Sequence, residues 1–253
     1  MIKIKSESEI LKMRESGSIL SRVFCFIKDK INIGMTTRSI DRMIEKFILD
    51  NNAVPSFKGY KGFPNASCIS INEEVVHGIP GEYVIKNGDI VSVDVGVFFN
   101  GFHSDAARSY LIGDLINKED QKLIDVTKES FFEGIKFAKE NNFLFDISNA
   151  IQEYTEKNGF SVVRDYVGHG IGSDIHEAPE VPNFKQNRRG VKLCYGMTLA
   201  IEPMINIGTH EVLKLDNHWT VMTKDKKKSA HYENTILITN GDPEILTLNL
   251  EEE

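Results

Sequence analysis

The chain has 253 residues, a formal net charge of −7 and cysteines only at Cys25, Cys68 and Cys194. Its length suits one domain with an ample core, and its acidic balance argues against a protein that binds nucleic acid or anionic membranes. An odd number of widely spaced cysteines is not typical of a disulfide framework or a zinc ribbon and favours the reducing cytoplasm. Because no apolar run approaches a membrane span of about 18 residues, we expect a soluble cytoplasmic protein.

Two helices are predicted before the first strands. The first begins at a Ser-x-x-Glu capping box at residues 6–9 and carries apolar residues at helical spacing until 32–34. The second begins at Thr36 or Thr37, whose hydroxyl can cap a helix. Residues 53–70 are rich in glycine, proline and aromatic residues, and we expect a long ordered loop that leads into a short strand.

A hairpin between residues 87 and 110 is the most informative stretch of the sequence. The β-branched run Ile90–Val97 favours a strand. Asn100-Gly101 then supplies the two positive-φ residues of a type I′ turn. A two-residue turn at this place predicts that Gly96 lies opposite Asp105.

Asp94 and Asp105 therefore point to the same side of the hairpin as diagonal neighbours. Their backbones should lie roughly 7–8 Å apart, close enough for both carboxylates to bind one cation. An acid in a buried strand is costly unless it is paired or metal-bound. On the hairpin alone, an ion pair with Arg108 and a solvent-facing edge are the alternatives to half of a metal site.

Beyond the hairpin, two further helices are predicted. Asn117 should cap one that runs to about Glu140, and Asp146 should begin another that ends at Asn158-Gly159. Strand-like residues 161–167 then lead into a Gly-His-Gly sequence.

An internal repeat relates the two halves of the chain. Residues 88–94 and 196–202 each contain a glycine turn, an apolar strand and an acid six residues after the glycine. A helix and a His-Gly dipeptide recur in the same order. We therefore predict a single domain, residues 1–253, with pseudo-repeat halves at about 1–115 and 116–250. This arrangement places Asp94 and Glu202 across a pseudo-twofold axis.

The second half completes a candidate ligand set of four carboxylates and one imidazole: Asp94, Asp105, His169, Glu202 and Glu233. Carboxylates this close would repel one another without cations, and two divalent ions are the natural remedy. An oxygen-rich set suits Mn, Fe or Co better than a structural zinc site, although Zn can bind. Two such ions can bridge a water and generate hydroxide, with one Glu as general base.

Each ligand also has a simpler explanation. A glycine-flanked histidine such as His169 is often structural, and Glu202 before a proline can cap a strand. Outside the ligand set, His77 and His176 could hold a leaving amide nitrogen and stabilise an oxyanion.

The motifs together resemble type I methionine aminopeptidase in its short bacterial form, over essentially the whole chain. They are His77-Gly-Ile-Pro80, Val93-Asp-Val-Gly96, Gly101-Phe-His-Ser-Asp105, Gly168-His-Gly-Ile-Gly172, His176-Glu-Ala-Pro179, Met197-Thr-x-x-Ile-Glu-Pro-Met204 and Tyr232-Glu-x-Thr235. The resemblance implies the α+β pita-bread fold, in which two pseudo-symmetric halves surround a dinuclear metal centre. It also implies removal of the initiator methionine from nascent chains with a small second residue.

By this resemblance, Asp94 would bind one metal ion, and His169 and Glu202 the other. Asp105 and Glu233 would bridge both ions. Glu202 would act as the general base for attack by a metal-bridging hydroxide.

The same resemblance places His77 at the scissile amide nitrogen and His176 at the carbonyl oxygen. The methionine pocket would draw on Tyr60, Phe63, Cys68, Trp219 and Phe57. Asn72, Glu74 and Ser229 would surround a monovalent cation, Na or K. The implied partners are N-terminal methionyl peptides and, transiently, the ribosome, and nothing demands more than a monomer.

The chain departs from its bacterial relatives at four positions near the site. Phe57 replaces a usual cysteine and Ile175 a usual phenylalanine, so the pocket should be reshaped. His231 and Asn234 stand where Gln and His are common, next to a proposed metal ligand, and should tune the metal.

Two other functions compete with the methionine aminopeptidase. A proline-specific peptidase of the same fold normally carries a further N-terminal domain, for which the first 90 or so residues leave no room. A catalytically inactive binding protein of this fold would have lost metal ligands, whereas this chain keeps all five.

Overall fold

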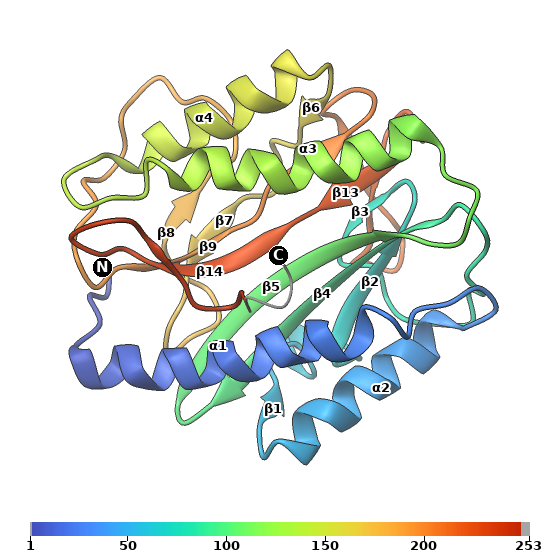
Figure 1. Ribbon diagram of the computed structural model, residues 1–253, viewed down its shortest axis with the longest axis horizontal. Coiled ribbons are helices and arrows are strands. Elements are labelled where there is room, and N and C mark those ends of the chain that lie inside the picture. The colour runs from blue at the N-terminus through green and yellow to red at the C-terminus, as the bar shows by residue number, and fades with distance from the viewer. Residues whose placement is uncertain (1, 249–253) are drawn as a thin grey trace.

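The computed structural model describes residues 2–248 and has mixed α and β architecture (Figure 1). Its main sheet runs in the order β1-β4-β5-β14-β9-β7-β8, with β2 beside β4 and β15 beside β14. These strands are β1 Val54–Pro55, β2 Ser67–Ile71, β4 Ile90–Phe99, β5 Phe102–Leu111, β7 Gly168–Gly170, β8 Glu177–Val181, β9 Thr198–Ile201, β14 Glu233–Leu237 and β15 Glu244–Ile245.

Two small sheets flank the main one. The first contains β13 (Ser229–His231), β10 (Met204–Asn206) and β6 (Ser161–Val162). The second contains β11 (Val212–Lys214), β12 (Val221–Thr223) and β3 (Glu74–Val76). The strand expected over 161–167 is thus confined to its first two residues.

Within residues 2–248, four α-helices cover the sheet in two pairs, and a short 3-10 helix spans Tyr60–Gly62. The four are α1 (Glu7–Ile27), α2 (Thr37–Asp50), α3 (Lys118–Ile135) and α4 (Leu144–Lys157). Figure 1 shows α1 and α2 across one part of the sheet and α3 and α4 across the other. Each pair encloses its own apolar core: Phe24 and Ile44 lie in the first, and Phe131 and Ile151 in the second.

The predicted helix starts are confirmed at α1 and α2. The Ser6 N–H donates to the Glu9 carboxylate at 2.8 Å, which closes the capping box. The Thr36 hydroxyl accepts from the Ser39 N–H at 3.1 Å. α1 ends at Ile27 and not near 32, because a turn follows that buries Ile31 in the core.

The later helices differ from the prediction at one end each. α3 ends at Ile135 and not near Glu140, because a tight turn carries the fully buried Ala138 into the core. α4 begins at Leu144 and not at Asp146, because the Leu144 N–H donates a hydrogen bond to the carbonyl oxygen of Val191 in a distant loop.

The hairpin has the predicted register. Gly96 lies opposite Asp105 and Phe99 opposite Phe102, and the turn residues Asn100 and Gly101 have φ of 50° and 88°.

The division of the chain into two repeated halves remains a prediction. None of the helices within residues 2–248 is long and apolar enough to span a membrane.

Candidate metal centre

Five neighbouring strands of the main sheet each contribute one acid or imidazole to a single site. In sheet order these are Asp94 on β4, Asp105 on β5, Glu233 on β14, Glu202 directly after β9, and His169 on β7. Side chains alternate between the faces of a strand, and the observed registers put all five on the face opposite the helices. The sequence-predicted ligand set is therefore brought together in space.

His169 is oriented so that one ring nitrogen faces the carboxylates. Its Nδ1 lies 2.9 Å from the Gly170 carbonyl oxygen, which can only accept a hydrogen bond, so Nδ1 carries the proton. The other nitrogen, Nε2, lies 3.7 Å from Glu202 Oε1 and 4.0 Å from Asp105 Oδ2. A neutral imidazole in this tautomer presents a lone pair to the site, as a metal ligand must.

The glycines beside His169 are required by strand packing. A Cβ on Gly168 would lie 2.3 Å from the Ala200 carbonyl oxygen, and one on Gly170 would lie 2.3 Å from that of Ala178. Both glycines permit a close backbone approach because they have no Cβ. In the fold they let β7 lie close to its neighbouring strands, which places His169 beside Glu202.

Asp105 and Glu233 are buried and Asp94 and Glu202 are half-buried, and several of their oxygens lack protein donors. Asp94 Oδ1, Asp105 Oδ1 and Glu233 Oε1 have no hydrogen-bond partner among residues 2–248. Burial raises the pKa of Asp94 to about 7. Buried acceptors without donors are costly.

The pKa values of the other three acids are shifted in the same direction. Burial and the neighbouring carboxylates raise the pKa of Asp105, Glu202 and Glu233 well above the usual range. Ligand atoms of Asp105, His169 and Glu233 lie within 4.8 Å of one another, a spacing that a metal ion can bridge. This donor set fits a divalent cation, which would satisfy the buried oxygens and their negative charge together.

The proposed substrate residues line the same cavity as the ligands. It has a volume of about 180 Å³ and is lined by Phe57, Tyr60, Lys61, Phe63, Cys68, His77, Asp94, Asp105, His169, His176, Glu202, Trp219 and Glu233. The Phe63 and Trp219 rings meet edge to face at 5.1 Å. A thiol and several aromatic rings thus form the apolar part of the cavity lining, and the thiol of Cys68 lies on the strand position opposite Asp94.

The two histidines outside the ligand set also line the cavity. His77 has a φ of +60° and packs edge-on against Tyr166 and Trp219. The ring of His176 stacks on Tyr60 at 5.3 Å and lies 4.2 Å from that of His169. Burial lowers the pKa of His77 to about 4 and also lowers the pKa of His176, so both rings are neutral near pH 7.

The segment that carries His176 is held by a buried ion pair. Lys5 Nζ lies 2.7 Å from Glu177 Oε2, and these side chains are 4 % and 3 % exposed. The other oxygen of Glu177 accepts from Lys3 Nζ at 3.1 Å and from the Asp174 N–H at 3.2 Å. The N-terminal segment that carries Lys3 and Lys5 therefore holds the loop that precedes His176 in place.

Two residues near the site, Lys61 and Tyr166, were not assigned a role from the sequence, and a third, His231, was expected only to tune the metal. Lys61 lines the cavity and Tyr166 supports His77, but a lysine between turn residues and a tyrosine after a short strand give no local signal. His231 Nε2 lies 3.9 Å from Glu202 Oε2 and 4.0 Å from Glu233 Oε2. Only its place beside Glu233 in the sequence pointed to it.

The positions at which the sequence departs from the bacterial pattern lie in different surroundings in the structure. Phe57 lines the cavity, whereas Ile175 is buried and does not line it. The Asn234 side-chain oxygen accepts from Arg108 Nη2 at 2.9 Å on the helix-covered face. Arg108 therefore points away from Asp94 and Asp105, and the alternative of an Asp–Arg pair is wrong.

Asn72 and Ser229, expected near a monovalent cation, are neighbours. The Ser229 N–H donates to the Asn72 carbonyl oxygen at 2.9 Å. The carboxylate of Glu74 accepts from the Ile71 N–H one residue before Asn72. A cation at this place remains a prediction.

Known proteins resemble this chain over nearly its whole length. The model of metallopeptidase family M24 matches residues 11–240. The methionine aminopeptidase of Clostridium perfringens is 57 % identical over 98 % of this chain and 99 % of its own length. The crystal structure of methionine aminopeptidase from Rickettsia prowazekii matches with a TM-score of 0.96 at 42 % identity. The match covers 98 % of this chain and 100 % of the crystallised chain.

The fold extends to a second kind of peptidase. A prolidase from Pyrococcus furiosus gives a TM-score of 0.77 at 22 % identity, a likeness of fold alone, and this chain covers 65 % of its length. These neighbours confirm the predicted α+β pita-bread fold.

Proposed function

The chain belongs to metallopeptidase family M24, and we propose that it removes the N-terminal methionine from peptides and nascent proteins whose second residue is small. One observation carries this proposal: five metal-ligand side chains and a pocket of aromatic rings and a thiol share one cavity. The 57 % identity to a methionine aminopeptidase over almost the full chain supports the same reaction.

Two divalent ions would be held by the five ligands. Asp94 would hold one ion, His169 and Glu202 the other, and Asp105 and Glu233 both. A divalent ion in such a site acts as a Lewis acid and lowers the pKa of water. Four carboxylates with one imidazole favour Mn, Fe or Co, with Zn as a further candidate.

Glu202 is the proposed general base. Its Oε1 lies beside His169 Nε2, and burial raises the pKa of its carboxyl well above the usual range. A carboxylate with a raised pKa takes a proton from an attacking water more readily than an ordinary one. It then releases the proton to the departing amine.

His77 and His176 are proposed to orient the scissile bond. Both line the same cavity as the acids and are neutral near pH 7, so each can donate one N–H without adding charge. His77 would contact the amide nitrogen, and His176 would stabilise negative charge that develops on the carbonyl oxygen.

The apolar side of the cavity suits an unbranched thioether. Phe63 and Trp219 form one wall and Tyr60 another, and Cys68 lies 5 % exposed next to the acids. Sulfur makes favourable contacts with aromatic rings. Phe57, where the resemblance implies a cysteine, adds a rigid ring to this lining.

The partners and the working environment belong to the proposal as well. We expect transient contact with the ribosome, a monomeric enzyme and a cytoplasmic location, with Na or K bound near Asn72. The net charge of −7 and the cysteines Cys25, Cys68 and Cys194, none of them in a disulfide, are compatible with this setting.

The test is a comparison of peptides with chelated protein to which Mn²⁺, Fe²⁺, Co²⁺ or Zn²⁺ is added back. Metal-restored cleavage of Met-Ala-Ser, and not of Leu-Ala-Ser, Gly-Pro or Ala-Pro-Ala, is the expected result. Cleavage of the proline peptides alone would replace the proposal by a proline-specific peptidase. A folded protein that cleaves none of them would be a binding protein.

A further inference from the structure

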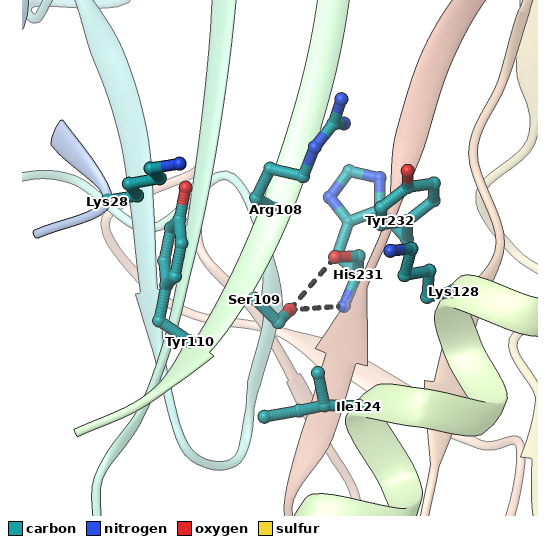
Figure 2. A pocket seen from close by; sticks show the side chains of 8 residues that line it. All are labelled: Lys28, Arg108, Ser109, Tyr110, Ile124, Lys128, His231 and Tyr232. Atoms are coloured by element: carbon teal, nitrogen blue, oxygen red, sulfur yellow. Dashed lines mark hydrogen bonds between the residues drawn. The ribbon is translucent and has the colours of Figure 1, made fainter. Parts of the chain in front are cut away.

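The substrate cavity meets solvent at Lys61 and His176. These two side chains are exposed, whereas the other described residues that line the cavity are buried or half-buried. A second cavity lies on the helix-covered face of the sheet (Figure 2), and none of the described residues lines both cavities. A substrate chain that continues beyond the scissile bond must therefore leave the site past Lys61 and His176.

The size of the substrate cavity decides which part of a substrate lies at this exit. Pockets that bury a whole drug-sized ligand measure about 300–1,000 Å³, whereas this cavity has a volume of about 180 Å³. It therefore encloses the methionine and the bond to be cut, and the rest of the substrate lies outside. Because the second residue is small, the third residue is the first whose side chain is long enough to contact the exit.

Lys61 brings a positive charge to the exit. Its Nζ lies 5.2 Å from the centre of the Tyr60 ring, and the same ring stacks on that of His176 at 5.3 Å. Lys61 is the only Lys or Arg among the described residues that line the cavity. Burial lowers the pKa of His176, and the charge of Lys61 lowers it further. The ammonium therefore stands on the side of the cavity that would hold the scissile carbonyl.

The ammonium of Lys61 is available to a ligand. Within residues 2–248 no carboxylate forms an ion pair with it, whereas Lys58 in the same loop is paired with Glu45. The acids inside the cavity are the proposed ligands of the two metal ions. A carboxylate of the substrate can thus bind Lys61 without displacing an existing ion pair.

The backbone around Lys61 fixes where its side chain begins. Gly59, Lys61 and Gly62 have φ of 85°, 47° and 88°. A non-glycine residue in this left-handed region is strained and persists only where its surroundings impose the conformation. Here the Phe63 N–H donates to the Tyr60 carbonyl oxygen at 2.9 Å, which closes a tight turn over Lys61.

We propose that Lys61 is a specificity-determining residue that binds the carboxylate of an acidic third residue where the substrate leaves the cavity. This inference rests on the proposed function and names a subclass of its substrates, chains that begin with methionine, a small residue and then Asp or Glu. The contact is exposed, so it has modest strength and is screened by salt. Because it persists from the bound substrate to the transition state, it changes KM and not kcat.

The experiment measures kcat/KM of the metal-loaded full chain with the peptides Met-Ala-Glu-Ser and Met-Ala-Gln-Ser, both amidated at the C-terminus. The amide removes the terminal carboxylate, which would otherwise compete with the glutamate side chain for Lys61. The parent is compared with Lys61→Met and Lys61→Asn. Asparagine adopts the left-handed conformation more readily than most residues, so the second variant removes the charge without straining the loop. The matched control is Lys58→Met, which removes the same charge from the same loop but from outside the cavity.

Both Lys61 variants should lower the ratio of kcat/KM for the Glu peptide to that for the Gln peptide by about three- to fivefold, as expected for an exposed charge pair. The loss should lie in KM and should shrink when the salt concentration rises from about 0.01 M to about 1 M. An unchanged ratio in both variants, or an equal fall in Lys58→Met, would overturn the proposal.

Binding of uncleavable analogues separates this proposal from the proposed function. In these analogues the Met–Ala amide is reduced to CH₂–NH, and their affinity is measured by calorimetry on the same proteins. If the parent cleaves neither peptide, the proposed function fails, but a three- to fivefold or so loss of preference for the Glu analogue in the Lys61 variants would still support the role of Lys61. An unchanged preference, or no binding of either analogue, would overturn it.

Discussion

The buried ion pair between Lys5 and Glu177 should stabilise the protein through charge, and Glu177→Gln tests this. Glutamine has nearly the same shape, so the substitution leaves an ammonium 2.7 Å from a neutral amide in a place where both side chains are almost inaccessible. Removing one partner of a buried pair costs about 3–5 kcal/mol. Because the amide oxygen can still accept a hydrogen bond from Lys5, we expect the lower end, about 3 kcal/mol.

Thermal unfolding of the metal-loaded protein at pH 7 measures this loss. For a chain of this size, 1 kcal/mol corresponds to a change in Tm of about 2–4 °C, so Glu177→Gln should lower Tm by roughly 6–12 °C. The control is Lys3→Met, which removes a half-exposed partner of the same carboxylate and should cost less than about 1 kcal/mol. The reasoning would be refuted if the Tm of Glu177→Gln lay within about 2 °C of the parent's Tm, or if it were no lower than the Tm of Lys3→Met.

The same pair predicts a pH dependence of defined sign. Burial alone would raise the pKa of the Glu177 carboxyl, but hydrogen bonds from Lys5, the Asp174 N–H and Lys3 outweigh it and lower the pKa below 4.5. Stability from a carboxyl with a lowered pKa is present above its unfolded pKa and is lost as pH falls through the folded one. The difference in Tm between parent and Glu177→Gln should therefore shrink below pH 4.5 or so, and a constant difference would contradict this origin.

Three further predictions concern the metal centre. Glu202→Gln should lower kcat by at least about a hundredfold with an unchanged circular dichroism spectrum, and a rate near that of the parent would remove Glu202 from the mechanism. His77→Ala should lower kcat/KM while elemental analysis finds the parent's metal content; loss of metal would instead make His77 a ligand. In metal-free protein the pKa of Asp94 is raised to about 7, so its contribution to stability is lost as pH rises through 7. The Tm of that protein should fall between pH 5 and pH 8, and a Tm that rises over this range would contradict the assignment.

Local sequence signals predicted the hairpin completely. Asn100-Gly101 fixes the turn, and the turn fixes the register that places Asp94 and Asp105 on one face. The remaining ligands lie on strands that meet only in the folded sheet. The residues alone gave the candidate set of five ligands, which the structure brings to one cavity. The family resemblance added which ion each ligand would hold.

Features set by distant contacts could not be predicted from the sequence. α4 begins two residues early because a loop near Val191 satisfies its first N–H groups. The chain is interrupted between β13 and β14 at Tyr232, whose N–H donates to the Pro203 carbonyl oxygen. Lys61 reaches the cavity because its own backbone φ is +47°, and no residue pattern predicts this conformation.

The distribution of one ligand to each of five neighbouring strands makes metal binding a gauge of folding quality. A slip of one residue between two strands turns every side chain of the slipped strand to the other face. Such a slip at any of the four pairings β4-β5, β5-β14, β14-β9 or β9-β7 would withdraw at least one ligand from the site. The fraction of tightly bound metal in a refolded preparation therefore counts the molecules in which all of these strands are in register, including errors that leave the secondary-structure content unchanged.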